Sequence, residues 1–169
     1  MYTKEDWNNI KFKLEMVAIK FLKENYDMKL GIPIILNGRL KSTYGRFIHA
    51  NRKSKKRISR RIEMSKNYIE YQPWDIVIET LKHELIHYAL YELGKPYRDG
   101  DALFESELAK HGSHSTGTVA FKGSLHIYKC KNEQCGNVFE RHRRYPKNGE
   151  GYTCADCGSY IYYDGRKLV

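Results

Sequence analysis

The spacing of hydrophobic residues predicts three helices in the first two thirds of the chain. Over residues 3–26, apolar side chains recur every three or four positions with lysine and glutamate between them, which indicates an amphipathic helix capped by Thr3. Residues 74–93 show the same periodicity, between Pro73 at the start and Gly94 at the end. A shorter helix is expected over residues 102–110.

Three short apolar runs between the first two helices predict strands. They cover residues 32–36, 44–50 and 58–65, and the first ends in an Asn37-Gly38 turn. The second and third flank a run of basic residues, so we expect an antiparallel hairpin with its charge at the tip. Together the elements predict an α+β fold, in which a small antiparallel sheet packs on three helices.

The composition changes at about residue 122, where tyrosine, cysteine, glycine and short β-prone runs replace the helical pattern. We therefore expect a first domain over residues 1–121 and a second over residues 122–169. All four cysteines lie in the second, as two close pairs separated by eighteen residues: Cys130 with Cys135, and Cys154 with Cys157. Four thiolates at this spacing predict a structural zinc site in a β zinc ribbon, and the second pair argues against a redox site. So small a segment would not fold well without its metal.

Length and hydropathy favour a globular protein of the cytoplasm. No apolar run approaches the roughly 18 residues that a membrane span requires. The first residues lack the apolar stretch of a signal peptide, so we expect a cytoplasmic protein without membrane contact. In that compartment, paired cysteines are expected to bind metal rather than to form disulfides.

The formal charge of +10 comes from one stretch of the chain. Residues 39–66 contain eleven basic residues and one acid, and the remainder is balanced. Such a patch favours nucleic acid as a partner, although a solvated hairpin would show the same pattern. A second basic and aromatic mixture lies between the cysteine pairs and suits phosphates and unstacked bases. The candidate contact residues are Arg52, Lys53, Lys55, Lys56, Arg57, Arg60, Arg141, Arg143 and Arg144.

The helix predicted over residues 74–93 carries the sequence His83-Glu84-Leu85-Ile86-His87. Two histidines four positions apart project from one helix face and can both bind zinc at about 2.0–2.1 Å. Glu84 can reach water at that zinc without binding the metal, which suits a general base. The motif predicts a hydrolytic zinc site, so that with the cysteines we expect two zinc ions, one catalytic and one structural.

With these features the chain resembles the SprT-like (Spartan-like) metallopeptidase family over nearly its whole length. The likeness lies in the first helix, Gly45-Arg46-Phe47, Ile62-Glu63-Met64-Ser65, the His83–His87 helix, the Gly112 turn and the four-cysteine ribbon. It implies a compact zincin fold with a three-stranded sheet packed on helices. It also implies hydrolysis of peptide bonds, and cleavage of proteins bound or crosslinked to DNA.

Members of this family usually supply a third histidine about a dozen residues after the motif, where this chain has none. Asp99 stands twelve residues after His87 and five before Phe104, which matches the family position best. A carboxylate can bind zinc at about 2.0–2.2 Å, so Asp99 is our candidate third ligand. The alternatives are Asp101, which could instead cap the following helix, Glu105, Glu107, His111 and His114.

Two functions of different classes follow from these residues. The first is a zinc endopeptidase with Glu84 as general base, acting on DNA-associated proteins with single-stranded or crosslinked DNA as a partner. The second is a non-catalytic, zinc-stabilised nucleic-acid-binding protein with a degenerate peptidase site. The intact motif favours the first, because a pure binding protein has no use for Glu84. The missing third histidine and the basic hairpin favour the second.

Overall fold

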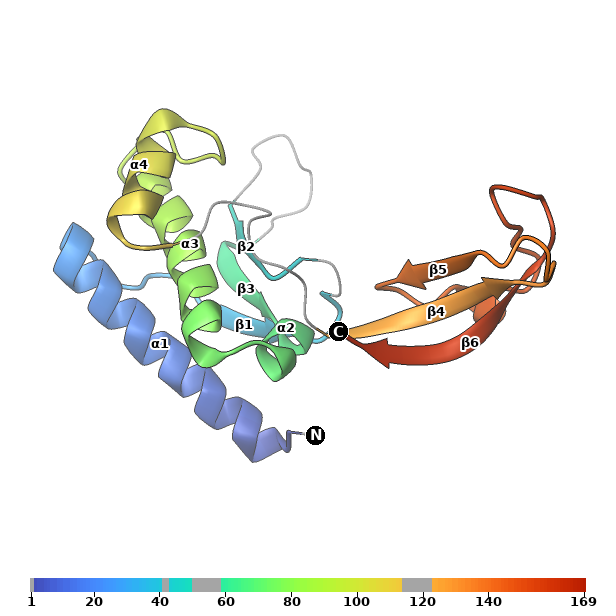
Figure 1. The fold of residues 1–169 in the computed structure, drawn as a ribbon. Coiled ribbons are helices and arrows are strands. Elements are labelled where there is room, and N and C mark those ends of the chain that lie inside the picture. The colour runs from blue at the N-terminus through green and yellow to red at the C-terminus, as the bar shows by residue number, and fades with distance from the viewer. Residues whose placement is uncertain (1, 41–42, 50–58, 114–122) are drawn as a thin grey trace. The chain divides into compact units, whose positions relative to one another are not determined.

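Residues 2–40, 43–49, 59–113 and 123–169 are described by the structure, which is a computed structural model. The chain divides into two units, Met1–Ala120 and Phe121–Val169, each with its own hydrophobic core. The first unit combines helices with a three-stranded sheet, and the second is a three-stranded sheet with the four cysteines (Figure 1). The predicted α+β class is therefore confirmed. No helix in the described ranges is both long and apolar enough to cross a membrane.

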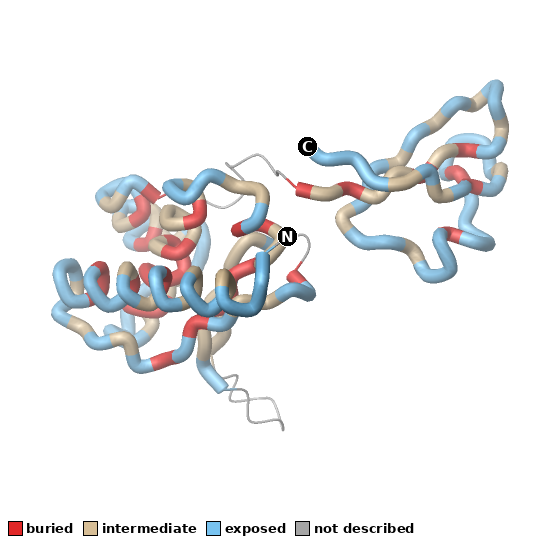
Figure 2. Tube along the Cα trace, turned by 90° about the horizontal axis from the view of Figure 1, so that it is seen from below, coloured by how far each residue is buried: buried red, intermediate tan, exposed pale blue. Residues whose placement is uncertain are grey.

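Helix α1 (Lys4–Tyr26) follows the predicted amphipathic pattern and begins at the predicted cap. The Thr3 hydroxyl accepts a hydrogen bond from the backbone N–H of Asp6 at 3.1 Å, and the Asp6 carboxylate accepts one from the backbone N–H of Thr3 at 2.7 Å. Buried positions recur along one side of this helix (Figure 2). They are Leu14, Ala18, Phe21 and Leu22.

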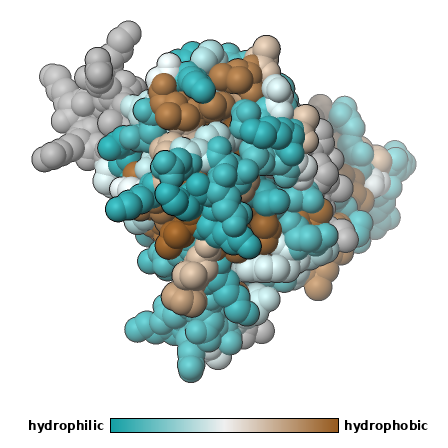
Figure 3. All heavy atoms as spheres, turned by 90° about the vertical axis from the view of Figure 1, so that its left-hand side faces the viewer, coloured by the Kyte–Doolittle hydropathy of each residue, from teal (hydrophilic) through white to brown (hydrophobic). Residues whose placement is uncertain are grey.

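The outer side of α1 is not purely polar. Phe12, Met16 and Ile19 are exposed there, at spacings of four and three residues. On the face drawn in Figure 3, hydrophobic residues reach the surface in separate groups between hydrophilic ones. At these spacings the three side chains are neighbours on one face of α1, and a small exposed apolar group of this kind is normal on a folded protein.

The sheet of the first unit has the strand order β1-β3-β2. Strand β2 (Gly45–Ile48) pairs antiparallel with β3 (Arg61–Ser65), as predicted for the hairpin, whereas β1 (Ile34–Asn37) runs parallel to β3. The expected antiparallel sheet is thus wrong in one pairing. Strand β3 lies between the two earlier strands. The chain direction reverses between β1 and β2 and again between β2 and β3, so β3 runs in the same direction as β1.

Among its described residues the first unit has four helices, not the predicted three. The sequence predicted α3 (Trp74–Glu92) and α4 (Ala102–Lys110), but not the short α2 (Lys66–Tyr71). Ser65 ends β3 and also caps α2, since its hydroxyl accepts a hydrogen bond from the Tyr68 N–H at 3.2 Å. Six residues are too few to show helical periodicity. Helix α3 packs against α1, α4 and the strands β2 and β3, which places it at the centre of the unit (Figure 1).

The second unit is an antiparallel sheet of order β5-β4-β6. Its strands are β4 (Ser124–Cys130), β5 (Val138–Arg141) and β6 (Ile161–Leu168), with the short helix η1 (Pro146–Gly149) between the last two. Its buried core contains only Tyr128, Cys130, Cys154 and Ile161 among the described residues. So small a core cannot hold a fold by hydrophobic burial alone, which makes the cysteines central to this unit.

Candidate metal centre

Helix α3 positions the two motif histidines. They lie one turn apart on the same face, with their Nε2 atoms 3.1 Å apart. Their side chains are 11% and 12% exposed, because most of α3 is buried around them. Two imidazoles this close and this well covered satisfy the first requirement of a metal site, a shared point at which both nitrogens can bind.

The loop that follows α3 brings Asp99 to both histidines. Its Oδ1 atom lies 3.2 Å from His83 Nε2 and 3.6 Å from His87 Nε2. Ligand atoms of a tetrahedral zinc site with bonds near 2.05 Å are about 3.3 Å apart. The three observed separations bracket this value, so the residues fit zinc. Three protein ligands, with the fourth position for water or substrate, are typical of catalytic rather than structural zinc.

Asp101 and Glu105, two of the alternative ligands, support this loop instead. The Asp101 carboxylate accepts a hydrogen bond from the backbone N–H of Arg98 at 2.8 Å. Asp101 is the N-cap residue of α4, as expected, but its side chain makes no capping hydrogen bond. The Glu105 carboxylate accepts a hydrogen bond from the backbone N–H of Gly100 at 2.9 Å. Both acids therefore hold the segment on either side of Asp99.

Glu107 and His111 face α1 rather than the motif. The Tyr26 hydroxyl donates to the Glu107 carboxylate at 2.7 Å, and the His111 ring packs edge-on against Phe21 at 5.0 Å. Burial alone would raise the pKa of Glu107, but the hydrogen bond from Tyr26 lowers it. His114 lies outside the described residues. The structure thus brings together Asp99, and not the other described acids, with the motif histidines.

His87 is held on two further sides. Its Nδ1 hydrogen bonds to the backbone carbonyl of Tyr97, which fixes the tautomer and leaves the Nε2 lone pair for a metal. The ring of Phe104, itself fully buried, stacks on His87 at 4.0 Å and meets His83 edge-on at 5.2 Å. Burial lowers the pKa of His87, which keeps the imidazole in the neutral form that binds metal.

Glu84 is buried beside the histidines, with 6% of its surface exposed. Burial raises its pKa to about 8, although a hydrogen bond from the Phe47 backbone opposes this. A methyl group at Gly45 would lie 3.0 Å from the Glu84 Cγ atom and 3.1 Å from its Oε1 atom. Strand β2 can therefore pass so close to this carboxylate because it has glycine there.

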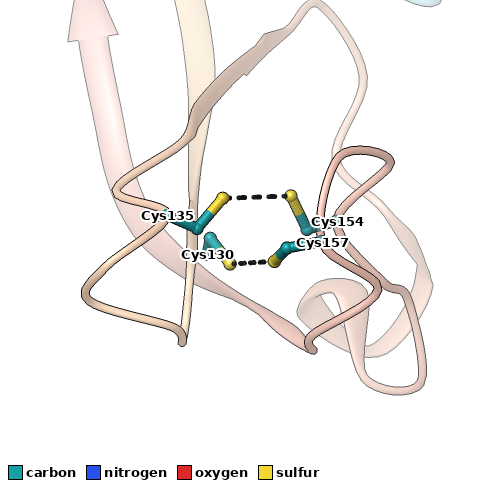
Figure 4. A group of neighbouring side chains, drawn as sticks. All are labelled: Cys130, Cys135, Cys154 and Cys157. Atoms are coloured by element: carbon teal, nitrogen blue, oxygen red, sulfur yellow. Dashed lines mark hydrogen bonds between the residues drawn. The ribbon is translucent and has the colours of Figure 1, made fainter.

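The four cysteines of the second unit converge from two turns (Figure 4). The Sγ atoms of Cys130 and Cys157 are 3.4 Å apart, and those of Cys135 and Cys154 are 3.8 Å apart. Thiolates bound to zinc at 2.3 Å in a tetrahedron are about 3.8 Å apart, so this set also fits zinc. The glycine after each pair has a positive φ, 61° and 73°, as the predicted tight turns require.

Of the residues proposed to contact nucleic acid, Arg52, Lys53, Lys55, Lys56 and Arg57 lie outside the described residues. Arg60 forms an ion pair with Glu92 at the end of α3, which neutralises part of its charge. Arg141, Arg143 and Arg144 are exposed on the second unit.

Two of these arginines lie over tyrosine rings. The Arg144 guanidinium lies 4.5 Å from the Tyr163 ring centroid and that of Arg141 5.7 Å from the Tyr145 centroid, and the two tyrosines both contact Tyr128. The arrangement is a continuous cluster of cations and aromatic rings.

Comparison with known proteins identifies the family. The model of the SprT-like family matches residues 15–117, which include the helix with both histidines and Asp99. The chain belongs to the SprT-like family. Proteins named "Protein SprT-like" from Streptococcus mutans serotype c and Streptococcus agalactiae serotype Ia are 30% and 33% identical over 122 and 123 residues, which is 72% of this chain and 76% and 78% of theirs. A "Protein SprT-like" from Staphylococcus epidermidis is 30% identical over 149 residues, 87% of this chain and 89% of its own.

Two features of this SprT-like site could not be found by reading its sequence. One is the carbonyl of Tyr97, because every residue has a carbonyl and only the fold shows which one meets His87. The other is His49, whose Nε2 atom lies 3.3 Å from the Tyr97 hydroxyl across 48 residues of chain. The periodicity of the helices gives no signal for either contact.

Proposed function

We propose that this chain is a zinc-dependent endopeptidase in which Glu84 is the general base. The proposal is supported by one arrangement. The three candidate ligand atoms lie at tetrahedral separations, and the buried carboxylate of Glu84, which is not one of the ligands, lies beside them. Zinc bound there supplies Lewis acidity, which polarises the carbonyl of a peptide bond and makes water more acidic. The protein's own task is to hold the metal, to orient its ligands and to move a proton.

Glu84 is placed to move that proton. Burial raises the pKa of Glu84, and the charge of a zinc ion beside it would oppose this and favour the ionised carboxylate. As water adds to the carbonyl carbon, a carboxylate oxygen of Glu84 accepts one of its protons and later delivers it to the leaving nitrogen, when the carbon–nitrogen bond breaks. Burial favours the neutral form of His87, its hydrogen bond to the Tyr97 carbonyl orients the ring, and Phe104 packs against the rings of both histidines. These roles require a rigid site, which α3 provides.

The test is metal content and peptide cleavage in matched variants. Wild type should contain two zinc ions per chain and cleave casein. Glu84→Gln should keep both ions and lose at least about 100-fold in rate, which is the usual contribution of a general base. Glu92→Gln, on the same helix but paired with Arg60, should cleave like wild type. Undiminished cleavage by Glu84→Gln, or a wild type with one zinc, would refute the proposal.

We further propose single-stranded DNA as a partner of the second unit, so that the peptidase acts on DNA-associated proteins. The supporting observation is a contrast between cations. Lys129 and Lys167 pair with Asp164 and Glu140 at 2.8 and 3.2 Å, whereas Arg144, over its tyrosine ring, has no carboxylate partner among the described residues. Stacked guanidinium groups and tyrosines suit bases and phosphates together.

Arg144→Ala should therefore weaken binding of a single-stranded oligonucleotide. The slope of its binding constant against salt concentration should fall by the equivalent of about one phosphate contact, whereas Lys167→Ala should change both the affinity and the slope little. Equal effects of the two would contradict the proposed surface. Binding without any peptide cleavage by wild type would instead support the alternative function, a non-catalytic nucleic-acid-binding protein.

A further inference from the structure

The segment that carries Asp99 has one side chain that is not exposed, that of Tyr97, besides the backbone hydrogen bonds that Asp101 and Glu105 accept. The chain from Leu93 to Gly100 joins α3 to α4, and every residue in it is exposed except Tyr97. Hydrogen bonds fix the two ends of the segment: Lys95 N–H donates to the Leu90 carbonyl at 2.9 Å, and Asp101 N–H donates to the Arg98 carbonyl at 3.0 Å. Between them only the Tyr97 ring packs against the core of the first unit.

That ring lies against two other aromatic side chains. His49, directly after β2, and Tyr91, on α3, stack on each other with ring centroids 5.3 Å apart and an angle of 25°. Tyr97 meets both edge-on, at 5.6 Å from His49 and 5.1 Å from Tyr91. Its hydroxyl also lies 3.3 Å from His49 Nε2, within reach of a weak hydrogen bond. We call His49 and Tyr91 the Tyr97 seat.

Tyr97 therefore contacts both parts of the candidate metal centre. Its carbonyl accepts the hydrogen bond from His87 Nδ1, which orients one ligand from outside the metal. Its side chain packs on His49 and Tyr91 and so fixes the backbone two residues before Asp99. Two residues of extended chain reach at most about 7 Å. The Asp99 side chain is 53% exposed.

We infer that Tyr97 is a positioning residue of the zinc centre, and that His49 and Tyr91 act through it. The inference rests on the zinc centre proposed above. Without the ring, the loop would keep the hydrogen bonds to Asp101 and Glu105 but lose its packing, so Asp99 would be held less closely to histidines that stay in place on α3. Without the hydroxyl alone, the ring and the carbonyl keep their places and the effect is smaller.

Zinc affinity of the histidine site measures this directly, independently of peptide cleavage. The full chain is titrated with a zinc chelator of known affinity, and the two ions are distinguished by replacing zinc with Co²⁺ and following the separate visible absorption of thiolate and histidine sites. Tyr97→Ala should weaken the histidine site by about 10–100-fold, as the loss of an outer-shell partner does. Tyr97→Phe and His49→Ala should weaken it by about 2–10-fold. The cysteine site should not change.

A double variant and a distant tyrosine are the controls. Because Tyr97→Phe and His49→Ala both remove the contact between the Tyr97 hydroxyl and His49, the effect of the double variant on zinc affinity should be less than the product of the two single effects. Tyr26→Phe, which loses a hydrogen bond to Glu107 at 2.7 Å in the same unit, should leave zinc affinity unchanged.

The outcomes separate positioning from general stability. Unchanged zinc affinity in both Tyr97→Ala and His49→Ala would overturn the inference. An equal loss of zinc affinity in Tyr97→Phe and in Tyr26→Phe would also overturn it, since the loss would then reflect the stability of the first unit. If wild type binds zinc at the histidines but cleaves nothing, the positioning role stands and the peptidase proposal fails; if the histidines bind no zinc, both fail.

Discussion

Gly45→Ala is expected to damage the candidate active site without touching a metal ligand. The added methyl group would lie 3.0 Å from Glu84 Cγ, 3.1 Å from Glu84 Oε1 and 3.1 Å from Thr80 Cγ2. Carbon atoms in contact prefer about 3.5–4.0 Å, so the two carbon–carbon pairs, with Glu84 Cγ and Thr80 Cγ2, are too close by about half an ångström. The only relief is movement of β2 away from α3 or of the Glu84 carboxylate within its buried position.

The size of the effect follows from these overlaps. Overpacking of one methyl group in a packed interior costs about 1–3 kcal/mol. In a unit of this size that corresponds to a fall of about 4–12 °C in melting temperature. Displacement of Glu84 by a few tenths of an ångström should lower kcat/KM by about 3–10-fold, since misplacement of catalytic groups by 1 Å costs about 100-fold.

The assay combines thermal unfolding, zinc content and casein cleavage for wild type, Gly45→Ala and Gly38→Ala. Gly38 is the matched control, because among the described residues its added methyl group would meet Lys66 Cδ alone, at an ordinary 3.9 Å. Gly45→Ala should retain two zinc ions, since the three atoms nearest to the added methyl group belong to Glu84 and Thr80 and not to a candidate metal ligand. A Gly45→Ala protein with the melting temperature and rate of Gly38→Ala would refute the packing argument.

Three other substitutions have outcomes that the contacts define. Burial alone would raise the pKa of Glu63, but hydrogen bonds from Arg61, Asn37 and Arg46 lower it. The contribution of the ionised Glu63 to the free energy of unfolding is therefore complete above the ordinary pKa of 4.5 and is lost as pH falls through the lowered value. Urea unfolding should therefore show Glu63→Gln to be less stable by about 1–3 kcal/mol at neutral pH, with the difference shrinking below about pH 4; a constant difference would contradict this. Cys154→Ser should unfold the second unit while the helices of the first stay protected in amide hydrogen exchange, and protection retained in β4 would count against it. Phe104→Leu should lower stability by about 1–2 kcal/mol and zinc affinity severalfold in a chelator titration, and wild-type affinity would show that the stacked ring is dispensable.

Sequence periodicity predicted the long helices well because each has enough turns to show its buried face. Helix α1 begins at the predicted cap, and α4 has the predicted bounds. Helix α2 has too few residues to show such a pattern. The parallel pairing of β1 was also missed, since an apolar run shows that a strand is buried but not which neighbour it takes.

The candidate site divides in the same way. His83 and His87 could be placed together because a helix fixes the spacing of residues four apart. Asp99 was identified by its position in a family pattern, and the structure puts its carboxylate within 3.6 Å of both histidines. Two other features were not predicted: Gly45, which makes room for Glu84, and the carbonyl of Tyr97, which binds His87. Both depend on contacts between segments that are distant in sequence, so local sequence patterns do not indicate them.

The half-exposed position of Asp99 has a consequence for metal exchange. Two ligands sit on a rigid helix and the third on a loop, so the histidine site can release its ion through loop opening alone, without unfolding of α3. In the cysteine site all four ligands come from the two turns that hold the second unit together, and release there requires that unit to open. When zinc is scarce, this protein should lose the ion at its proposed catalytic centre first and keep the fold of its ribbon.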